Sequence, residues 1–153
     1  MTMQWTASPV VVAAFLVAAI AWPPTAAADS TDDFRTAVVQ AHGGNCGALS
    51  ANPTVDKAAD IVTNSNEQWL NFTARVQPVP EPLPVLKDLG YGGSKASMAQ
   101  GAGLNAAQAI KATLLEASRY YSISDCSYTD YGVSIIQNQR TELWMTALVL
   151  AGP

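Results

Sequence analysis

Apolar residues recur at helical spacing near the start of the charged part of the chain. Phe34, Val38 and Ala41 follow one another at i, i+4 and i+7, behind the polar residues 31–33. This spacing places the three apolar side chains on one face of a helix, and a hydroxyl followed by two carboxylates suits a helix N-terminus. We therefore predict a first helix that begins at residue 31 and ends at Gly43.

Two further helices are predicted by capping residues and apolar stripes. Asn52-Pro53 is a cap followed by a first-turn proline, and the helix behind it extends towards Leu70. Asn105 caps another helix over residues 106–118. The stripes expected to be buried are Val55, Ala58, Ala59 and Val62 in the former, and Ala109, Ile110, Thr113, Leu114 and Ala117 in the latter.

Prolines alternate with other residues over Gln77–Pro84, which predicts an extended surface segment. A short helical turn over residues 84–89, ended by Gly90, is expected to follow. Residues 94–103 are mostly small, and their pattern predicts no particular element before the third helix.

The last part of the chain predicts a hairpin. Residues 133–137 and 143–150 have strand patterns, and residues 138–140 form the turn between them. The final segment is apolar on nearly every residue, so we expect helices on both faces of the sheet. The order of elements predicts an α+β fold: a three-layer α-β-α sandwich with a mostly antiparallel sheet.

The N-terminus carries an apolar run from Val10 to Ala21, too short to span a bilayer comfortably but typical of a signal-peptide core. Small residues at Ala26 and Ala28 suit signal peptidase, so we predict cleavage after Ala28. Residues 1–28 are then a signal peptide and residues 29–153 a single domain. The protein is expected to be secreted or associated with the cell envelope; a retained membrane anchor is the alternative.

Charge narrows the range of partners. The chain has eight Lys/Arg and twelve Asp/Glu, a formal net charge of −4, and the basic residues are scattered singly. Nucleic acids and anionic membrane surfaces both require clustered cations. We therefore expect no nucleic-acid partner.

The two cysteines are Cys46 and Cys126, separated by 80 positions. In an exported protein an isolated pair most simply forms a disulfide, and we predict one here. It would tie the loop after the first helix to the loop before the hairpin. Redox or metal-binding thiols are the alternative.

No catalytic pattern emerges from the ionisable residues. His42 is the only histidine, placed at the frayed end of the first helix, and no Gly-x-Ser-x-Gly motif accompanies it. The segment Gly101-Ala102-Gly103 before a helix is superficially like a dinucleotide-binding turn. Because no βαβ unit surrounds it, we interpret it as a close-packed turn from strand to helix. We expect no catalysis; a hydrolase built from unfamiliar residues is the alternative.

Three segments together resemble a known family. They are Lys87–Tyr91, Tyr128–Ser134 and Leu143–Met145. The chain from Phe34 to Gly152 resembles the CAP superfamily (cysteine-rich secretory, antigen 5 and pathogenesis-related proteins) in a small bacterial exported form. The resemblance implies an α-β-α sandwich with a groove on one face.

Members of that superfamily often hold a divalent metal in the groove with two histidines and acidic residues. Counting along the resemblance puts Asn71 or Phe72 at the earlier histidine position, Arg119 at the later one and Ala96 at the glutamate position. None of these side chains replaces the ligand, and an arginine repels a cation. The resemblance therefore implies a vestigial groove at Asn71, Ala96 and Arg119, with no metal and no cofactor.

The resulting hypothesis is a non-catalytic exported domain that acts by binding. The ligand would be small and apolar, such as a lipid or a sterol, or the partner would be an envelope protein; a purely structural or antigenic surface protein is a further alternative. Aromatic side chains concentrated near the C-terminus would pack in the core or line the groove: Tyr120, Tyr121, Tyr128, Tyr131 and Trp144.

Overall fold

The computed structural model describes residues 26–44, 46–120 and 122–153. The predicted signal peptide lies almost entirely outside them. The elements are, in order, α1 Ala26–His42, β1 Ser50–Ala51, α2 Pro53–Leu70, α3 Pro82–Asp88, β2 Lys95–Gly103, α4 Ala106–Arg119, the short 3-10 helix η1 Ser122–Ser124, β3 Asp130–Gln137 and β4 Trp144–Gly152. None of the described helices is long and apolar enough to cross a bilayer.

The strands form one mixed sheet in the order β1-β3-β4-β2. β4 is central and pairs antiparallel with both β2 and β3, whereas the two-residue β1 pairs parallel with the start of β3. The predicted hairpin and the mostly antiparallel sheet are confirmed.

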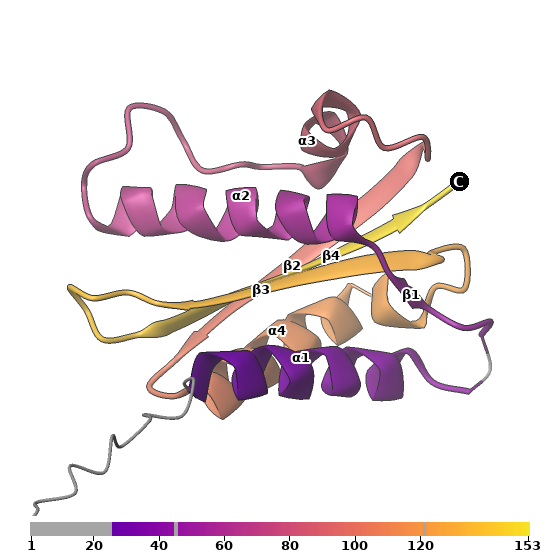
Figure 1. Ribbon diagram of the computed structural model, residues 1–153, viewed down its shortest axis with the longest axis horizontal. Helices are drawn as coiled ribbons and strands as arrows, with labels where there is room; N and C mark the ends of the chain where they lie inside the picture. Colours follow the sequence, from indigo (N-terminus) through magenta and orange to yellow (C-terminus); the bar gives the residue numbers. More distant parts are fainter. Residues whose placement is uncertain (1–25, 45, 121) are drawn as a thin grey trace, which may run out of the picture.

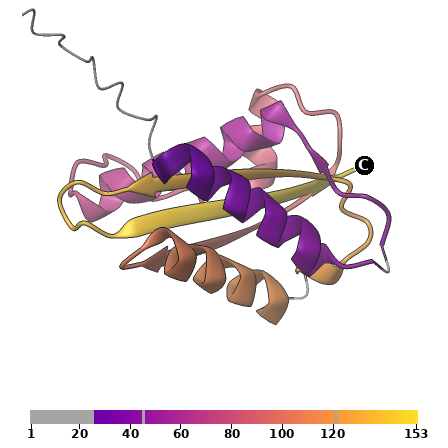
Figure 2. The ribbon, with the colours of Figure 1, turned by 60° about the horizontal axis from the view of Figure 1, so that its bottom comes forward.

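Helices cover both faces of this sheet (Figure 1). α2 and α3 lie on one face, and α1 and α4 lie together on the other, as the turned view also shows (Figure 2). The predicted three-layer α-β-α sandwich is therefore confirmed.

Side chains of β4 alternate between the two layers. Ala147, Val149 and Ala151 pack in a core cluster with α2 and α3, and Leu148 and Leu150 pack in the cluster with α1 and α4. Because both faces are buried, the strand carries apolar residues without interruption.

The predicted caps of α2 and α4 are confirmed. The Asn52 side chain accepts the Thr54 N–H at 3.0 Å, and the Asn105 side chain accepts the Gln108 N–H at 2.9 Å. Gly43, with φ of 80°, follows the end of α1. The predicted start of α1 at residue 31 is wrong, because the helix begins at Ala26. Alanine has the highest helix propensity, so the short alanine run extends the helix backwards.

Two other expectations need correction. Residues 95–103, for which no element was predicted, form strand β2. The short helix predicted over residues 84–89 is present as α3, but it begins at Pro82, which was predicted as extended and lies in the first turn, where a missing N–H costs no hydrogen bond. The chain before Pro82, including Gln77, lies outside helix and strand.

The interpretation of Gly101 and Gly103 as a close-packed turn into a helix is confirmed. A Cβ at Gly101 would lie 2.5 Å from the Ala109 carbonyl oxygen, and one at Gly103 would lie 2.6 Å from the Gln108 Cβ. These glycines let α4 lie directly on β2. That close contact explains why a strand of small residues forms here despite its low β propensity.

Candidate functional site

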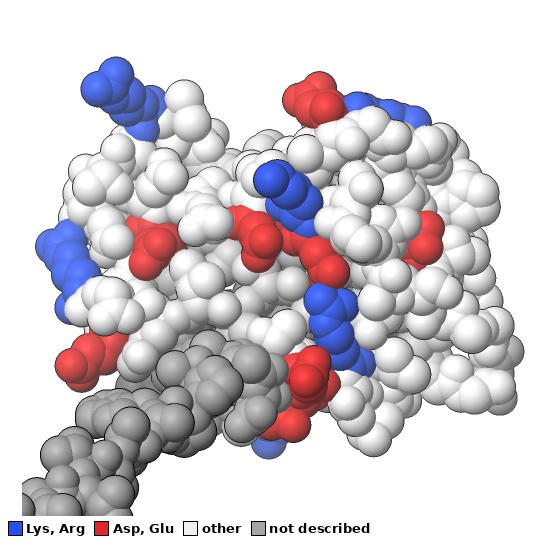
Figure 3. All heavy atoms as spheres, viewed as in Figure 1, with Lys and Arg blue, Asp and Glu red and all other residues white. Residues whose placement is uncertain are grey.

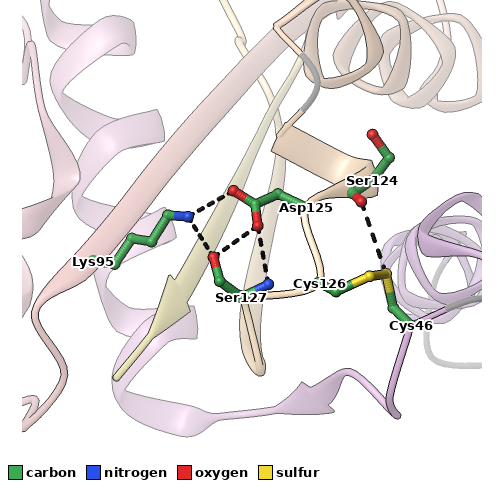
Figure 4. Close-up of polar contacts among 6 residues, drawn as sticks. All are labelled: Cys46, Lys95, Ser124, Asp125, Cys126 and Ser127. Carbon is green, nitrogen blue, oxygen red and sulfur yellow. Dashed lines mark hydrogen bonds and ion pairs between the residues drawn. A yellow bond between two sulfur atoms is a disulfide. The ribbon is translucent and has the colours of Figure 1, made fainter.

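The disulfide is present as predicted. Cys46 and Cys126 are bonded, with their Cα atoms 5.0 Å apart. The bond joins the loop after α1 to the loop between η1 and β3, and Cys46 Sγ contacts the Ser124 carbonyl oxygen at 3.8 Å (Figure 4). It closes one end of the layer formed by α1 and α4.

His42 lies beside this covalent link. Its side chain is buried, at 6% exposure, and Nδ1 lies 2.8 Å from the Ile123 carbonyl oxygen. A carbonyl only accepts, so Nδ1 carries the hydrogen, and the buried Nε2 has no hydrogen-bond partner among the described residues. His42 is therefore a structural residue joining α1 to η1. Its predicted position at the end of the first helix is confirmed, since α1 ends at His42, but that end is held by the buried side chain and is not frayed.

A polar trio lies on the other side of the same loop (Figure 4). Lys95 Nζ donates to Asp125 Oδ2 at 2.6 Å and also to Ser127 Oγ, and Ser127 Oγ in turn donates to Asp125 Oδ1 at 2.7 Å. The Lys95 ammonium also lies 4.5 Å from the centre of the Tyr128 ring. The three residues join the start of β2 to the loop that carries the disulfide.

This trio superficially combines a nucleophile with a base, but its electrostatics do not suit hydrolysis. The hydrogen bond to Asp125 raises the pKa of Lys95, so the amine stays protonated and cannot accept a proton from Ser127. The same bond, with those from Ser127, holds the pKa of Asp125 well below its usual range. The arrangement is an ion pair with a supporting hydroxyl.

The three residues predicted for the vestigial groove lie apart. Asn71 caps the end of α2, where its Oδ1 accepts the Asn138 amide at 3.1 Å from the hairpin turn. Ala96 packs near the opposite end of the sheet, in the core cluster with α2 and α3. Arg119 is exposed in the last turn of α4, on the other face of the sheet.

Asn71, Ala96 and Arg119 therefore do not form one groove, which corrects that prediction. The positions came from counting along the chain. A count does not specify which face of the sheet a residue meets, because that depends on which helices pack on each face: α2 and α3 on one, α1 and α4 on the other. Among the described residues, no group of three or more His, Cys, Asp or Glu side chains is placed to hold a metal ion.

An apolar groove runs between α1 and α4, with a volume of about 380 Å³. Its lining is mainly alanine and leucine, with one acidic and one basic side chain. The lining residues are Asp33, Ala37, Ala106, Ala107, Ile110, Lys111, Leu114, Leu115 and Ser118. We call it the α1–α4 groove.

Sequence reasoning did not find this groove, although its signal was visible. Leu114 was predicted on the buried stripe of α4, but it is only partly buried, and its neighbour Leu115 is 61% exposed. Two adjacent leucines cannot share one narrow stripe of a helix. The second leucine marks the apolar surface that α1 leaves uncovered.

The aromatic residues divide between the two alternatives considered. Tyr128 and Tyr131 are buried in the core cluster with α1 and α4. Tyr120 is 68% exposed, Trp144 is partly buried on β4, and Tyr121 lies outside the described residues. None of the four described aromatic side chains lines the α1–α4 groove.

Comparison with known proteins identifies the fold. No family model and no curated protein sequence matches this chain. Four chains of solved structures match, and three of them show the low sequence identity of these matches. An outer surface protein from Borrelia burgdorferi has a TM-score of 0.62 at 10% identity, covering 81% of this chain and 92% of that one.

The other two structures are larger. An extracellular protein containing an SCP domain from Bacillus anthracis has a TM-score of 0.60 at 11% identity, covering 82% of this chain and 41% of that one. A cysteine-rich secretory protein from Staphylococcus aureus has a TM-score of 0.62 at 10% identity, covering 86% and 41%. This chain spans less than half the length of either protein. The shared architecture is that of the CAP domain, as the sequence resemblance implied.

Proposed function

We propose that this CAP-fold domain works outside the cytoplasm as a non-catalytic binding protein. Its ligand is an elongated apolar molecule, such as a single acyl chain, held in the α1–α4 groove. The observation that carries the proposal is the lining: six of its nine side chains are Ala, Ile or Leu, on a surface that would otherwise face water.

The dimensions of the groove suit such a ligand. The lining residues on α4 run from Ala106 to Ser118, which corresponds to about 18 Å along a helix axis. The volume of about 380 Å³ falls within the range usual for small-molecule sites. Lys111 is the one cation of the lining, and it offers a partner for an acidic headgroup.

Binding explains the described ionisable residues better than catalysis does. Lys95 and Asp125 are paired with each other, and His42 is buried against a backbone carbonyl. In the α1–α4 groove the one hydroxyl, that of Ser118, donates to the Leu114 carbonyl oxygen at 2.8 Å, so it is not paired with the Asp33 carboxylate as a nucleophile with its base. A hydrolase would have to find its base elsewhere.

An extracytoplasmic location agrees with three observations. The N-terminal apolar run has signal-peptide character, the cysteines form a disulfide, and the matching structures include an outer surface protein and an extracellular protein. Disulfides persist in oxidising compartments. On the face drawn in Figure 3, the basic side chains lie apart from one another, with acidic side chains between several of them.

The test combines identification with a matched pair of variants. Native mass spectrometry of the protein purified from its own host would show a bound apolar molecule, and a fluorescent fatty acid would give its affinity. Leu115→Arg introduces a charge into the groove, and Leu104→Arg makes the same change at a residue that is 77% exposed and outside the lining. We expect Leu115→Arg to weaken fatty-acid binding about tenfold or more, because a charge in an apolar site is poorly solvated.

Leu104→Arg should bind like the wild type. Equal affinity in both variants would overturn the proposed site. A different result would be an envelope protein that co-purifies with the wild type, but not with Leu115→Arg, while no lipid is bound. The ligand of the groove would then be that protein and not a lipid. Lys111→Met distinguishes the contribution of the headgroup from that of the acyl chain. The variant should bind a fatty acid more weakly than the wild type does, but the corresponding alcohol equally well.

A further inference from the structure

A second groove lies on the opposite face of the sheet, between the C-terminal half of α2 and strands β2 and β4. Its volume is about 310 Å³. Its lining is Thr63, Asn66, Trp69, Leu70, Gln100, Gly101, Ala102, Met145 and Thr146. We call it the α2–β2 groove. It differs from the α1–α4 groove in having an aromatic ring, an amide pair and no charged side chain.

The aromatic ring belongs to Trp69, which is 51% exposed in the last turn of α2. A tryptophan offers a large flat apolar face with one polar atom at its edge. Leu70 beside it is also exposed, at 42%. Both residues leave apolar surface open to a ligand.

The amide pair lies farther into the groove. The Asn66 side chain donates to the Gln100 side-chain oxygen, linking α2 to β2. This leaves the Asn66 side-chain oxygen and the Gln100 amide group available to a ligand. The Gln100 amide nitrogen lies 3.5 Å from the weakly accepting Met98 sulfur. Whichever way each amide is turned, a bonded pair still presents one acceptor and one donor.

The threonines that line the groove are already bonded within the protein. Thr63 donates to the Ala59 carbonyl oxygen at 3.0 Å, and the Thr146 hydroxyl lies 2.6 Å from that of Thr113 on α4. The Asn66–Gln100 pair is therefore the principal polar feature available to a ligand. An acyl chain over it would bury amide groups without partners, which is costly.

A peptide strand is also a poor fit. β2 is an edge strand, and edge strands can pair with a further strand through their outward backbone groups. Here the Glu116 carboxylate accepts the Gln100 backbone N–H at 2.7 Å. That contact occupies the edge at the middle of β2, next to the groove.

We infer that the α2–β2 groove binds an uncharged saccharide, with a sugar ring stacked on Trp69 and its hydroxyl groups bonded to the Asn66–Gln100 pair. A sugar ring presents C–H groups on one face and hydroxyls at its edge, which matches an apolar ring beside a donor and an acceptor. The absence of charged lining residues favours a neutral sugar over an anionic one. This site is independent of the proposed acyl-chain site, which lies on the other face of the sheet.

The test is an NMR titration of the whole purified protein with three neutral probes, maltotetraose, cellotetraose and tetra-N-acetylchitotetraose, and with an anionic heparin tetrasaccharide. The signals followed are the indole N–H of Trp69 and the side-chain amides of Asn66 and Gln100. At least one neutral probe should shift all three residues at millimolar concentration, and heparin should not. Which probe binds distinguishes a plain hexose chain from an N-acetylated one.

Variants locate the site. Trp69→Ala should weaken the binding probe about tenfold, in keeping with the loss of a buried aromatic contact, and Trp69→Phe should retain part of the affinity. Trp144→Phe is the matched control, because Trp144 pairs with Gly103 and shares its α4-facing side of the sheet. Leu115→Arg, which disables the α1–α4 groove, should also leave sugar binding unchanged.

Three results would overturn the inference. In the first, no neutral probe shifts the signals. In the second, Trp69→Ala keeps a native amide spectrum elsewhere and yet shows the same sugar-induced shifts as the wild type. In the third, heparin binds more tightly than the neutral sugars. Loss of sugar binding in Leu115→Arg would assign the sugar to the other groove. Because fatty-acid binding is measured separately, failure of one proposal leaves the other standing.

Discussion

Asp56 and Val133 are joined across the edge of the sheet. The Asp56 carboxylate accepts the backbone N–H of Val133 at 3.0 Å through Oδ1, while Oδ2 accepts from Arg35 at 2.9 Å. One side chain in the first turn of α2 thus contacts both β3 and α1, which lies in the opposite layer. β1 covers this edge of the sheet only at the start of β3. It satisfies an outward N–H and connects all three layers.

Removing the Asp56 carboxylate should lower the free energy of unfolding more than removing its ion-pair partner Arg35 does. We expect Asp56→Ala to lower the free energy of unfolding by about 2 kcal/mol, because a backbone N–H loses a charged acceptor. Arg35→Met should lower it by about 0.5–1 kcal/mol, as for a partly exposed pair. Urea denaturation of both variants measures the difference. Equal costs would show that the Val133 hydrogen bond contributes little.

Gly132 should tolerate no side chain. A Cβ there would lie 2.2 Å from the Val55 carbonyl carbon and the Asp56 nitrogen, both of which are backbone atoms of α2. Gly132→Ala must push the helix off the sheet, and we expect a loss of about 3 kcal/mol or more. Gly92→Ala is the matched control, since nothing lies within 4 Å of its Cβ. It should be neutral or stabilising by up to about 1 kcal/mol.

The disulfide should affect stability more than it affects structure. The chain-entropy relation gives about 4.5 kcal/mol as the upper figure for closing a loop of 80 residues. The double change Cys46→Ala and Cys126→Ala should therefore lower the melting temperature clearly. The His42–Ile123 hydrogen bond joins the same two segments, so the fold should survive. A variant with a native melting temperature, or one that does not fold at all in the cold, would contradict this view.

Tyr91 should titrate later than an ordinary tyrosine. Its hydroxyl donates to Asp130 Oδ2 at 2.6 Å. Two effects raise the pKa of Tyr91 from 10.0 to about 12: desolvation, which is the larger, and this hydrogen bond. A raised pKa means that the stabilisation is complete below pH 10 and is lost as the pH rises through about 12. The ultraviolet absorbance of tyrosinate measures this step.

The Tyr91→Phe variant identifies the residue responsible. It should lack the late step, and its stability should fall less steeply over the same pH range. The other tyrosine absorbances should not change. A late step that persists in the variant would belong to a different tyrosine.

Local pattern was sufficient for much of the fold. The caps at Asn52 and Asn105 and the apolar stripes that follow them act over one or two helical turns. They can therefore be recognised in the local sequence, without knowledge of the rest of the chain. The uninterrupted apolar run of β4 likewise required cover on both faces. Strand β2 was missed because its small residues have little strand propensity of their own; the contact of α4 with Gly101 and Gly103 accounts for it.

Three long helices, the hairpin, the pairing of Cys46 with Cys126 and the layered architecture could be predicted from the sequence, since each depends on local periodicity or on a unique partner. The place where a ligand could enter depends on tertiary packing. Ala96 packs on the face of the sheet that α2 and α3 cover, whereas Arg119 belongs to α4 on the other face, so the sheet separates the two residues. Both grooves are surfaces where a helix covers its neighbour incompletely, and that depends on how helices distant in sequence pack, which no local pattern specifies.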